Sequence, residues 1–199
     1  ALNPARLSVA AWVKAAAWTP QPDYGVIVGK DSDVGGNKGY VLRTGDNGRL
    51  SFSVSVNGVW CEALTSQVMS TGTWYHVAGT FDGSAARVYL NGNLQASQPC
   101  PGALAHTTGP LNIGRDPTWT DRRFTGAIDE VAIVGSSLAD TQIQTVMEAR
   151  YNLSDMVVSP ADPLWYEGRA KNELLNRYAQ GLLRIQTPST VVNQVPPTT

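Results

Sequence analysis

One stretch constrains the fold of this chain more than any other: residues 73–93, TWYHVAGTFDGSAARVYLNGN. It contains the pairs Asp82-Gly83 and Asn91-Gly92, which are typical of tight hairpin turns because Asn, Asp and Gly tolerate a positive φ. On both sides of the first turn apolar residues alternate with polar ones, and the apolar set is Tyr75, Val77, Phe81, Ala86, Val88 and Leu90. The stretch therefore predicts two antiparallel strands with one buried face.

Similar short segments recur along the first three quarters of the chain. Alternation and turn residues predict further strands at residues 7–14, 24–30, 40–44, 50–57, 59–64, 111–114 and 124–134. A helix capping box at 137–140 predicts one short helix that ends near Arg150. Since strands and helices do not alternate, residues 1–150 are predicted to form an all-β, two-sheet antiparallel β-sandwich of the jelly-roll type.

Some side chains are expected in the interior of this sandwich. Asp129 shares its parity with Val131 and Ile133, so its carboxylate is predicted to point toward the core and to need a cation there, Lys30 or an arginine. Trp12 and Trp74 are also expected in the core.

Composition excludes two classes of protein. Among 199 residues the formal net charge is −1 and the longest basic run is Arg122-Arg123, so the positive surface of a nucleic-acid binder is missing. The sequence also lacks an apolar stretch of membrane-spanning length. We therefore expect a soluble protein without a membrane span, whose export signal, if it had one, has been removed.

The chain has two cysteines, Cys61 and Cys100, on either side of the central hairpin. A disulfide would close a loop of about 40 residues, worth roughly 4 kcal/mol in the chain-entropy model. The alternative is a pair of buried thiols in a cytosolic protein. We favour the disulfide, because no CxxC or His-rich spacing competes for the pair and an all-β pattern suits a secreted domain.

Residues 151–199 have a different character. Leu175, Tyr178, Leu182 and Ile185 recur at helical spacing, which predicts a helix at about 163–185 followed by an extended, Pro-rich arm. The apolar stripe of this tail is expected to pack on the sandwich itself or to bind other copies or subunits of a larger assembly.

Several segments together resemble a known family. The segments AWVK, GYVLR, WYHVAGTFDGSAARVYLNG, LNIGR and FTGAIDEVAIVGSSLADTQI are similar, in this order, to the laminin-G-like, pentraxin-like branch of the concanavalin A-like lectin and glucanase superfamily. The resemblance covers about residues 1–150. It implies a β-sandwich that is usually extracellular, often with one disulfide near the positions of Cys61 and Cys100, and that binds glycans, proteins or surfaces, in some members through calcium.

The chain departs from this family at its start. Family domains usually begin with a strand before the turn at residues 2–4, whereas this chain begins at Ala1. The sheet edge beside residues 124–134 is therefore expected to be open, and we hypothesise that the tail or a partner fills it with an extended segment.

Catalysis is not expected. The glucanases of this superfamily place carboxylates at alternate positions of one strand, so that both face one cleft. The nearest candidate is Asp129-Glu130, and adjacent residues of a strand point to opposite faces. The sequence thus predicts a protein that is not an enzyme.

A calcium site is the less supported of two interpretations of the loop after residue 30. Asp31 and Asp33 supply carboxylate oxygens there, and Asp129 is a further candidate ligand. However, Leu42 stands where an EF-hand needs its glutamate, and Asp is also an ordinary turn residue. No cofactor is therefore expected to be required, with Ca²⁺ as an optional ligand.

The candidate ligand-binding residues are arginines and aromatic residues outside the predicted core: Arg43, Trp60, Arg87, Tyr89 and Trp119. Aromatic rings stack on sugars, and arginines donate paired hydrogen bonds to carboxylates or hydroxyls. The tryptophans have the alternative role of core residues.

We therefore predict a non-catalytic binding or adhesion module, extracellular or on a cell or virion surface, that recognises a glycan or a protein surface. The alternative is a structural subunit of a surface layer, filament or viral or phage fibre, assembled through the open sheet edge and the tail.

Overall fold

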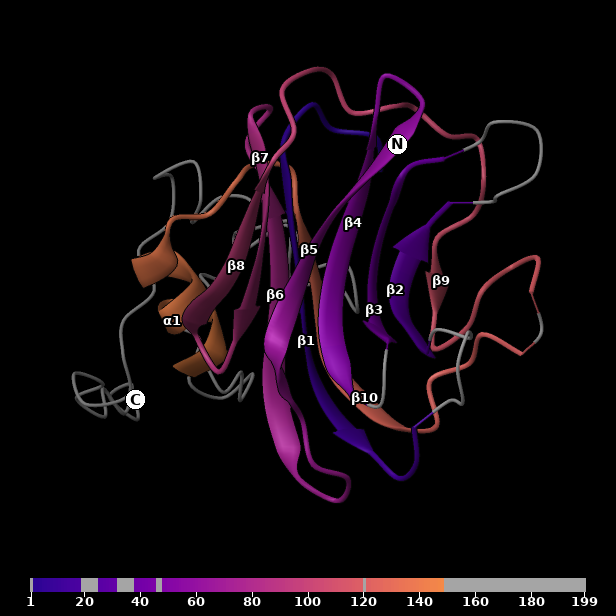
Figure 1. Cartoon of the computed structure of the whole chain (residues 1–199), viewed down its shortest axis with the longest axis vertical. Coiled ribbons are helices and arrows are strands. Elements are labelled where there is room, and N and C mark those ends of the chain that lie inside the picture. The colour runs from indigo at the N-terminus through magenta and orange to yellow at the C-terminus, as the bar shows by residue number, and fades with distance from the viewer. Residues whose placement is uncertain (1, 19–24, 32–37, 46–47, 120, 149–199) are drawn as a thin grey trace, which may run out of the picture.

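The computed structural model describes residues 2–18, 25–31, 38–45, 48–119 and 121–148. Within these residues two antiparallel sheets of five strands pack face to face, and one short helix follows them (Figure 1). The first sheet has the order β10 (Gly126–Val134), β1 (Leu7–Ala15), β6 (Trp74–Phe81), β7 (Ala85–Leu90) and β8 (Asn93–Pro99). The second has the order β5 (Val59–Val68), β4 (Arg49–Val56), β3 (Tyr40–Gly45), β2 (Gly25–Lys30) and β9 (Asn112–Ile113). The all-β sandwich predicted from the sequence is confirmed.

The central hairpin forms as its turn residues predict. Strands β6 and β7 pair in the register Val77↔Leu90 to Phe81↔Ala86, and Asn91 adopts the positive φ of 49° that a tight turn needs. The following strand, β8, is a third member of this meander that the sequence did not predict as a strand, because its residues are mostly polar and exposed.

The core lies between the sheets. It contains the inward residues of both layers, including Val9, Leu42, Phe52 and Val88, all fully buried. Gly79 on β6 lies directly against the ring of Phe52 on β4, so that a side chain at this position would overlap the ring. A glycine here lets the two sheets approach each other closely.

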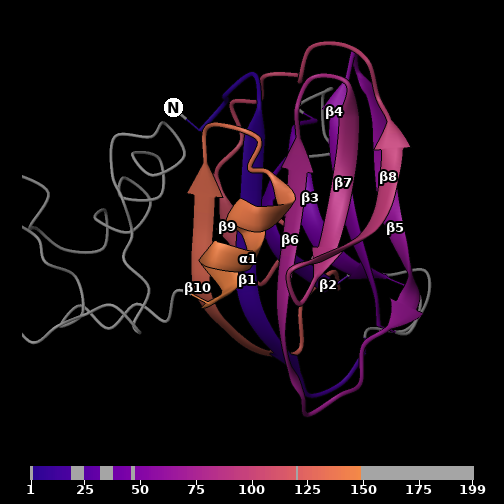
Figure 2. The ribbon, with the colours of Figure 1, turned by 90° about the vertical axis from the view of Figure 1, so that its left-hand side faces the viewer.

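The helix α1 (Asp140–Glu148) lies across the outer side of the first sheet (Figure 2). A second apolar cluster joins the helix and its preceding loop to that face: Ala10, Ala78, Tyr89, Ala132, Val134, Leu138, Ile143 and Val146. The helix begins two residues later than the predicted capping box implies, with the backbone N–H of Ala139 donating to Gln142 Oε1 at 2.9 Å.

The predicted disulfide between Cys61 and Cys100 is present, with the two Cα atoms 6.1 Å apart. Cys61 lies on β5 and Cys100 directly follows β8. Since these strands end the two sheets on the same side of the sandwich, the bridge joins one layer to the other.

The prediction that Asp129 points toward the core was wrong. A β-bulge in β10, where Glu130 has a φ of 50°, shifts the register against β1 between Ala10 and Trp12. An inserted residue reverses the alternation, so Asp129 is exposed, and one of its oxygens accepts the Glu130 backbone N–H at 2.7 Å. Lys30, its expected partner, instead donates to the carbonyl oxygens of two loop residues, Thr107 and Gly109.

The expected core position of Trp74 was also wrong. Its side chain lies on the outer face of the first sheet and is 41% exposed. The Lys14 ammonium lies 5.4 Å from the centre of its ring, a cation–π contact that does not need burial.

Three sequence predictions concern residues of the tail, which lie outside the described residues. They are the helix at about 163–185, the extended arm, and the hypothesis that the tail fills the sheet edge formed by β10, the end strand of the first sheet. Among the described residues, no helix is long and apolar enough to cross a membrane.

Candidate functional site

The five predicted ligand-binding residues do not form one site. Arg87 and Tyr89 lie on β7, on the outer face of the first sheet, and Arg43 and Trp60 lie on β3 and β5 of the second. Trp119 lies in the loop that follows β9. The structure therefore separates the candidates into three places.

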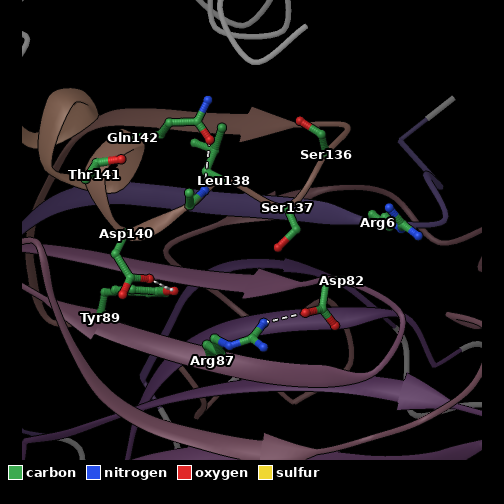
Figure 3. Close-up of a pocket in the computed structure, with 11 residues that line it drawn as sticks. Arg6, Asp82, Arg87, Tyr89, Ser136, Ser137, Leu138, Asp140, Thr141 and Gln142 are labelled. Carbon is green, nitrogen blue, oxygen red and sulfur yellow. Dashed lines mark hydrogen bonds and ion pairs between the residues drawn. The ribbon is translucent and has the colours of Figure 1, made fainter.

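Arg87 and Tyr89 line an open pocket between β7 and the segment that leads into α1 (Figure 3). We call it the Arg87 pocket. Its volume is about 690 Å³, which is in the usual range for small-molecule sites. It is lined by Arg6, Asp82, Arg87, Tyr89 and residues 136–142.

The β6–β7 turn fixes the position of Arg87. Asp82 Oδ1 accepts the backbone N–H groups of Ser84 and Ala85 at 2.8 and 2.9 Å, and its Oδ2 accepts Arg87 Nη1 at 2.6 Å. Burial acts to raise the pKa of Asp82, but hydrogen bonds from Ser84, Arg87 and backbone N–H groups lower it more, so it lies well below its usual value. Asp82 is therefore a fixed anion that holds the guanidinium in place.

The opposite end of the pocket is fixed by Tyr89 and Asp140. The buried Tyr89 hydroxyl donates to Asp140 Oδ1 at 2.8 Å. Burial, and then this hydrogen bond, raise the pKa of Tyr89 to about 12, so the phenol keeps its proton and remains a donor. The loop between them is tied to β1, because Ser8 Oγ donates to the Ser136 carbonyl and accepts the Leu138 N–H.

Several polar groups of the pocket remain available to a ligand. Among the described residues, Arg87 has one hydrogen-bonding partner for its five N–H donors, and Arg6 has none. The side-chain hydroxyls of Ser136, Ser137 and Thr141 likewise have no acceptor in the described part of the chain. The pocket thus offers donors and acceptors that folding has not used.

Sequence reasoning found only part of this site. It assigned Ser137 and Asp140 to a helix capping box and did not consider Arg6 or Ser136. These residues lie far from β7 in the sequence, and only the docking of α1 on the first sheet brings them beside Arg87.

The outer face of the second sheet holds Arg43 and Trp60 among small polar residues. Arg43 Nη2 lies 3.1 Å from Glu62 Oε1, and the pair covers Ser51 and Ser53, which are fully buried. Burial acts to raise the pKa of Glu62, but hydrogen bonds from the two serines and the charge of Arg43 lower it more. Trp60 is half-buried on the same face, opposite the buried Ser55.

Trp119 is presented by a loop of its own. Its ring is 47% exposed, and the Arg122 guanidinium lies 5.1 Å from the ring centre. Asp116 accepts the Trp119 backbone N–H at 2.8 Å and lies 3.7 Å from Arg122. These contacts make Trp119 a separate exposed aromatic platform.

The candidate metal ligands do not converge. Asp31 is buried at the outer face of the second sheet, near Gly29 and Val41, whereas Asp129 lies on the outer face of the first sheet, opposite Trp12. Asp33 lies outside the described residues. No group of three His, Cys, Asp or Glu side chains that could hold an ion occurs within the described ranges, so Asp31 and Asp129 cannot share one.

Comparison with known proteins identifies the family. Residues 1–144 match a laminin G model described as the concanavalin A-like lectin/glucanases superfamily. The chain belongs to this superfamily. No curated protein matches the lectin-like chain in sequence.

Solved structures of lectin-like sandwiches resemble this member of the superfamily. A heptameric SAP-like pentraxin from Limulus polyphemus has 18% identity and a TM-score of 0.57 over 73% of this chain and 71% of its own. A putative carbohydrate binding protein from Bacteroides ovatus has 20% identity and a TM-score of 0.58, over 71% of this chain and 40% of its own. Domain 4 of an extracellular arabinanase from Geobacillus stearothermophilus, in complex with arabinotriose, has 23% identity and a TM-score of 0.58, over 73% and 68%. At these identities the likeness establishes the lectin-like fold alone.

Proposed function

We propose that this domain is a non-catalytic, extracellular glycan-binding module and that the Arg87 pocket is its binding site. The observation that carries the proposal is the convergence, in one open pocket, of an arginine and a carboxylate that are each fixed by a hydrogen bond and of three hydroxyls that have no acceptor among the described residues. The superfamily and two of its structural relatives, one described as a putative carbohydrate binding protein and one in complex with arabinotriose, support the same class of ligand.

The chemistry of the pocket suits a saccharide. Each sugar hydroxyl both donates and accepts hydrogen bonds, so a sugar site needs both kinds of partner in fixed positions. Arg87 and Asp140 supply them, and each is held by a protein partner before a ligand arrives. Preorganised groups lose little conformational entropy on binding.

The two carboxylates of the pocket do not form a glycosidase pair. A glycosidase needs one carboxyl group that retains its proton and a second that acts as base or nucleophile. Asp82 is strongly acidic, and both of its oxygens are occupied by the turn and by Arg87. Asp140 alone cannot supply both roles, so we propose binding without turnover.

Two further properties belong to this proposal. The disulfide between Cys61 and Cys100 is typical of oxidising compartments, which supports a role outside the cell. Binding in the Arg87 pocket is expected to be independent of calcium, because the two carboxylates that line the pocket, Asp82 and Asp140, are engaged by Arg87 and Tyr89.

The test is a glycan array followed by titration calorimetry with the best ligand, using three variants. Ser137→Trp fills the pocket from its wall, and Ser66→Trp, at an exposed position of β5 in the other sheet, is the matched control. Trp60→Ala tests the second sheet. We expect Ser137→Trp to abolish binding, the other two variants to retain it, and EDTA to leave it unchanged.

Other results would contradict the proposal in distinct ways. Binding lost in Trp60→Ala but kept in Ser137→Trp would move the site to the second sheet. An array without any bound glycan would leave assembly as the better hypothesis, and size-exclusion chromatography of the same sample would then be expected to give polymers rather than a monomer.

A further inference from the structure

The Arg87 pocket is electrically asymmetric, and this asymmetry narrows the class of sugar that it can bind. Figure 3 shows Asp140 with Tyr89 near one end, and Arg6 and Asp82 near the other.

The end formed by Arg6, Arg87 and Asp82 carries two cations and one anion. The anion is already engaged, since Asp82 accepts hydrogen bonds from its own turn and from Arg87. Arg87 is 29% exposed and keeps most of its donors open, while Arg6 is exposed and has no partner among the described residues. This end therefore has an excess of one positive charge and of N–H donors, which a carboxylate matches in charge and in geometry.

The end formed by Asp140 has the opposite requirement. One oxygen of Asp140 accepts the Tyr89 hydroxyl, and the other has no partner within the described part of the chain. The Tyr89 hydroxyl is a neutral donor, so it brings no positive charge to offset the carboxylate. The free oxygen can accept a hydrogen bond from a ligand hydroxyl, and it repels a second anion.

We propose that the Arg87 pocket binds a carboxylate-bearing sugar residue of the uronic acid type. Its carboxylate lies toward Arg6 and Arg87, and its ring hydroxyls lie toward Asp140, with the Ser137 side chain between. This inference rests on the proposed glycan-binding function and names the class of glycan. A neutral sugar has no negative charge to pair with the two arginines. A polyanion with a charge on every sugar residue would place one of its charges beside Asp140, which repels it.

The experiment is calorimetry with oligosaccharides of galacturonate, glucuronate and mannuronate, each compared with its carboxyl-reduced, neutral form. A sulfated neutral oligosaccharide distinguishes a carboxylate from a sulfate as the recognised anion. We expect at least one acidic oligosaccharide to bind about tenfold more tightly than its reduced form, as a charge-assisted bidentate contact allows.

Three variants test which residues of the pocket contact the bound sugar. Arg6→Gln removes an exposed cation that has no partner among the described residues, and it is expected to lower the affinity for the acid severalfold while the affinity for the neutral form stays the same. Asp140→Asn is expected to weaken both forms. Arg115→Gln is the matched control, since Arg115 is an exposed arginine in the loop after β9 and makes the same change of charge. Thermal melting of each variant establishes that it is folded.

The outcomes separate this inference from the proposed function. Equal affinity for acidic and reduced forms overturns the inference and leaves glycan binding intact. Preference for the sulfated sugar overturns the assignment of a carboxylate. Acid binding that is unchanged in Arg6→Gln but lost in Arg115→Gln places the site elsewhere. If neither acidic nor neutral sugars bind, the proposed function fails as well.

Discussion

At the scale of single residues, the alternation within β7 correctly predicted the direction of two side chains. Arg87 and Tyr89 were predicted to point outward, and both line the pocket. The sequence did not reveal which residues would lie beside these two side chains in the folded protein. Asp140 lies 51 residues beyond Tyr89, and nothing local distinguishes a carboxylate that accepts a tyrosine hydroxyl from one that caps a helix.

Asp129 illustrates the limit of parity arguments. The alternation predicted an inward carboxylate, and one residue of bulge at Glu130 turned it outward. Bulges depend on register against the neighbouring strand, here β1, so a single strand read alone does not reveal them. The charge of Asp129 agrees with the outward position, since burying it would have been costly.

Asp82 gives a prediction about pH. Its folded-state pKa lies below the unfolded value, so its contribution to stability is present at neutral pH and is lost as the pH falls below about 5. We expect Asp82→Asn to lower the free energy of unfolding by about 1 kcal/mol at pH 7, because the carboxylate is partly exposed. At pH 3 the difference from the wild type should be smaller but still measurable, because the folded-state pKa of Asp82 lies well below its usual value and the loss is complete only when the pH falls through it.

The measurement for Asp82 is urea unfolding at both pH values. Asp121→Asn is the control, since Asp121 is an exposed aspartate whose carboxylate has no partner among the described residues. A pH-independent difference between Asp82→Asn and the wild type would mean that packing, rather than charge, accounts for the loss.

At the scale of elements, most strands with clean alternation were predicted to within about two residues, but β5 continues to Val68, beyond its predicted end at residue 64, and β8 was not predicted at all. The serine-rich β4 and the central β6 and β7 all have one apolar face. In contrast, β8 ends its sheet and is mostly exposed, so neither face of it needs apolar residues. The turn at Asn91-Gly92 was the available signal for this strand, since such a turn normally joins two strands.

The close contact between β6 and β4 gives a prediction at this scale. In Gly79→Ala the new Cβ would overlap three atoms of the Phe52 ring, which is fully buried and cannot move away freely. Overpacking of this kind typically costs about 1–3 kcal/mol. We expect a lower midpoint of chemical unfolding with unchanged cooperativity.

A second substitution distinguishes overpacking from other effects of alanine. In Gly79→Ala combined with Phe52→Leu, the smaller side chain makes room for the Cβ. The double variant should therefore be more stable than the sum of the two single changes predicts. Strict additivity would argue against a direct clash between positions 79 and 52.

At the scale of the whole molecule, the sandwich followed from turn residues and alternation, because both act locally and repeat along the chain. The position of α1 on the outer side of one sheet did not follow, since any exposed apolar face could receive an amphipathic helix. The structure shows why this face receives the helix. Three neighbouring strands present small outward side chains there, which leave room for α1: Ala10, Ala78 and Ala132. The pocket exists only because this docking occurs.

The disulfide affects the stability of the sandwich as a whole, so its removal is expected to change global unfolding. Cys61 and Cys100 join the end strands of the two sheets across 39 positions of sequence. Closing such a loop restricts the unfolded chain, so Cys61→Ser/Cys100→Ser should lower the free energy of unfolding by roughly 2–4 kcal/mol. The two layers should still pack, since the core between them is apolar and continuous. Circular dichroism and glycan affinity at low temperature are therefore expected to match the wild type, while the melting temperature falls. A double variant that is unfolded at low temperature would mean that the core alone cannot hold the sheets together. An unchanged melting temperature would mean that the disulfide does not stabilise the sandwich.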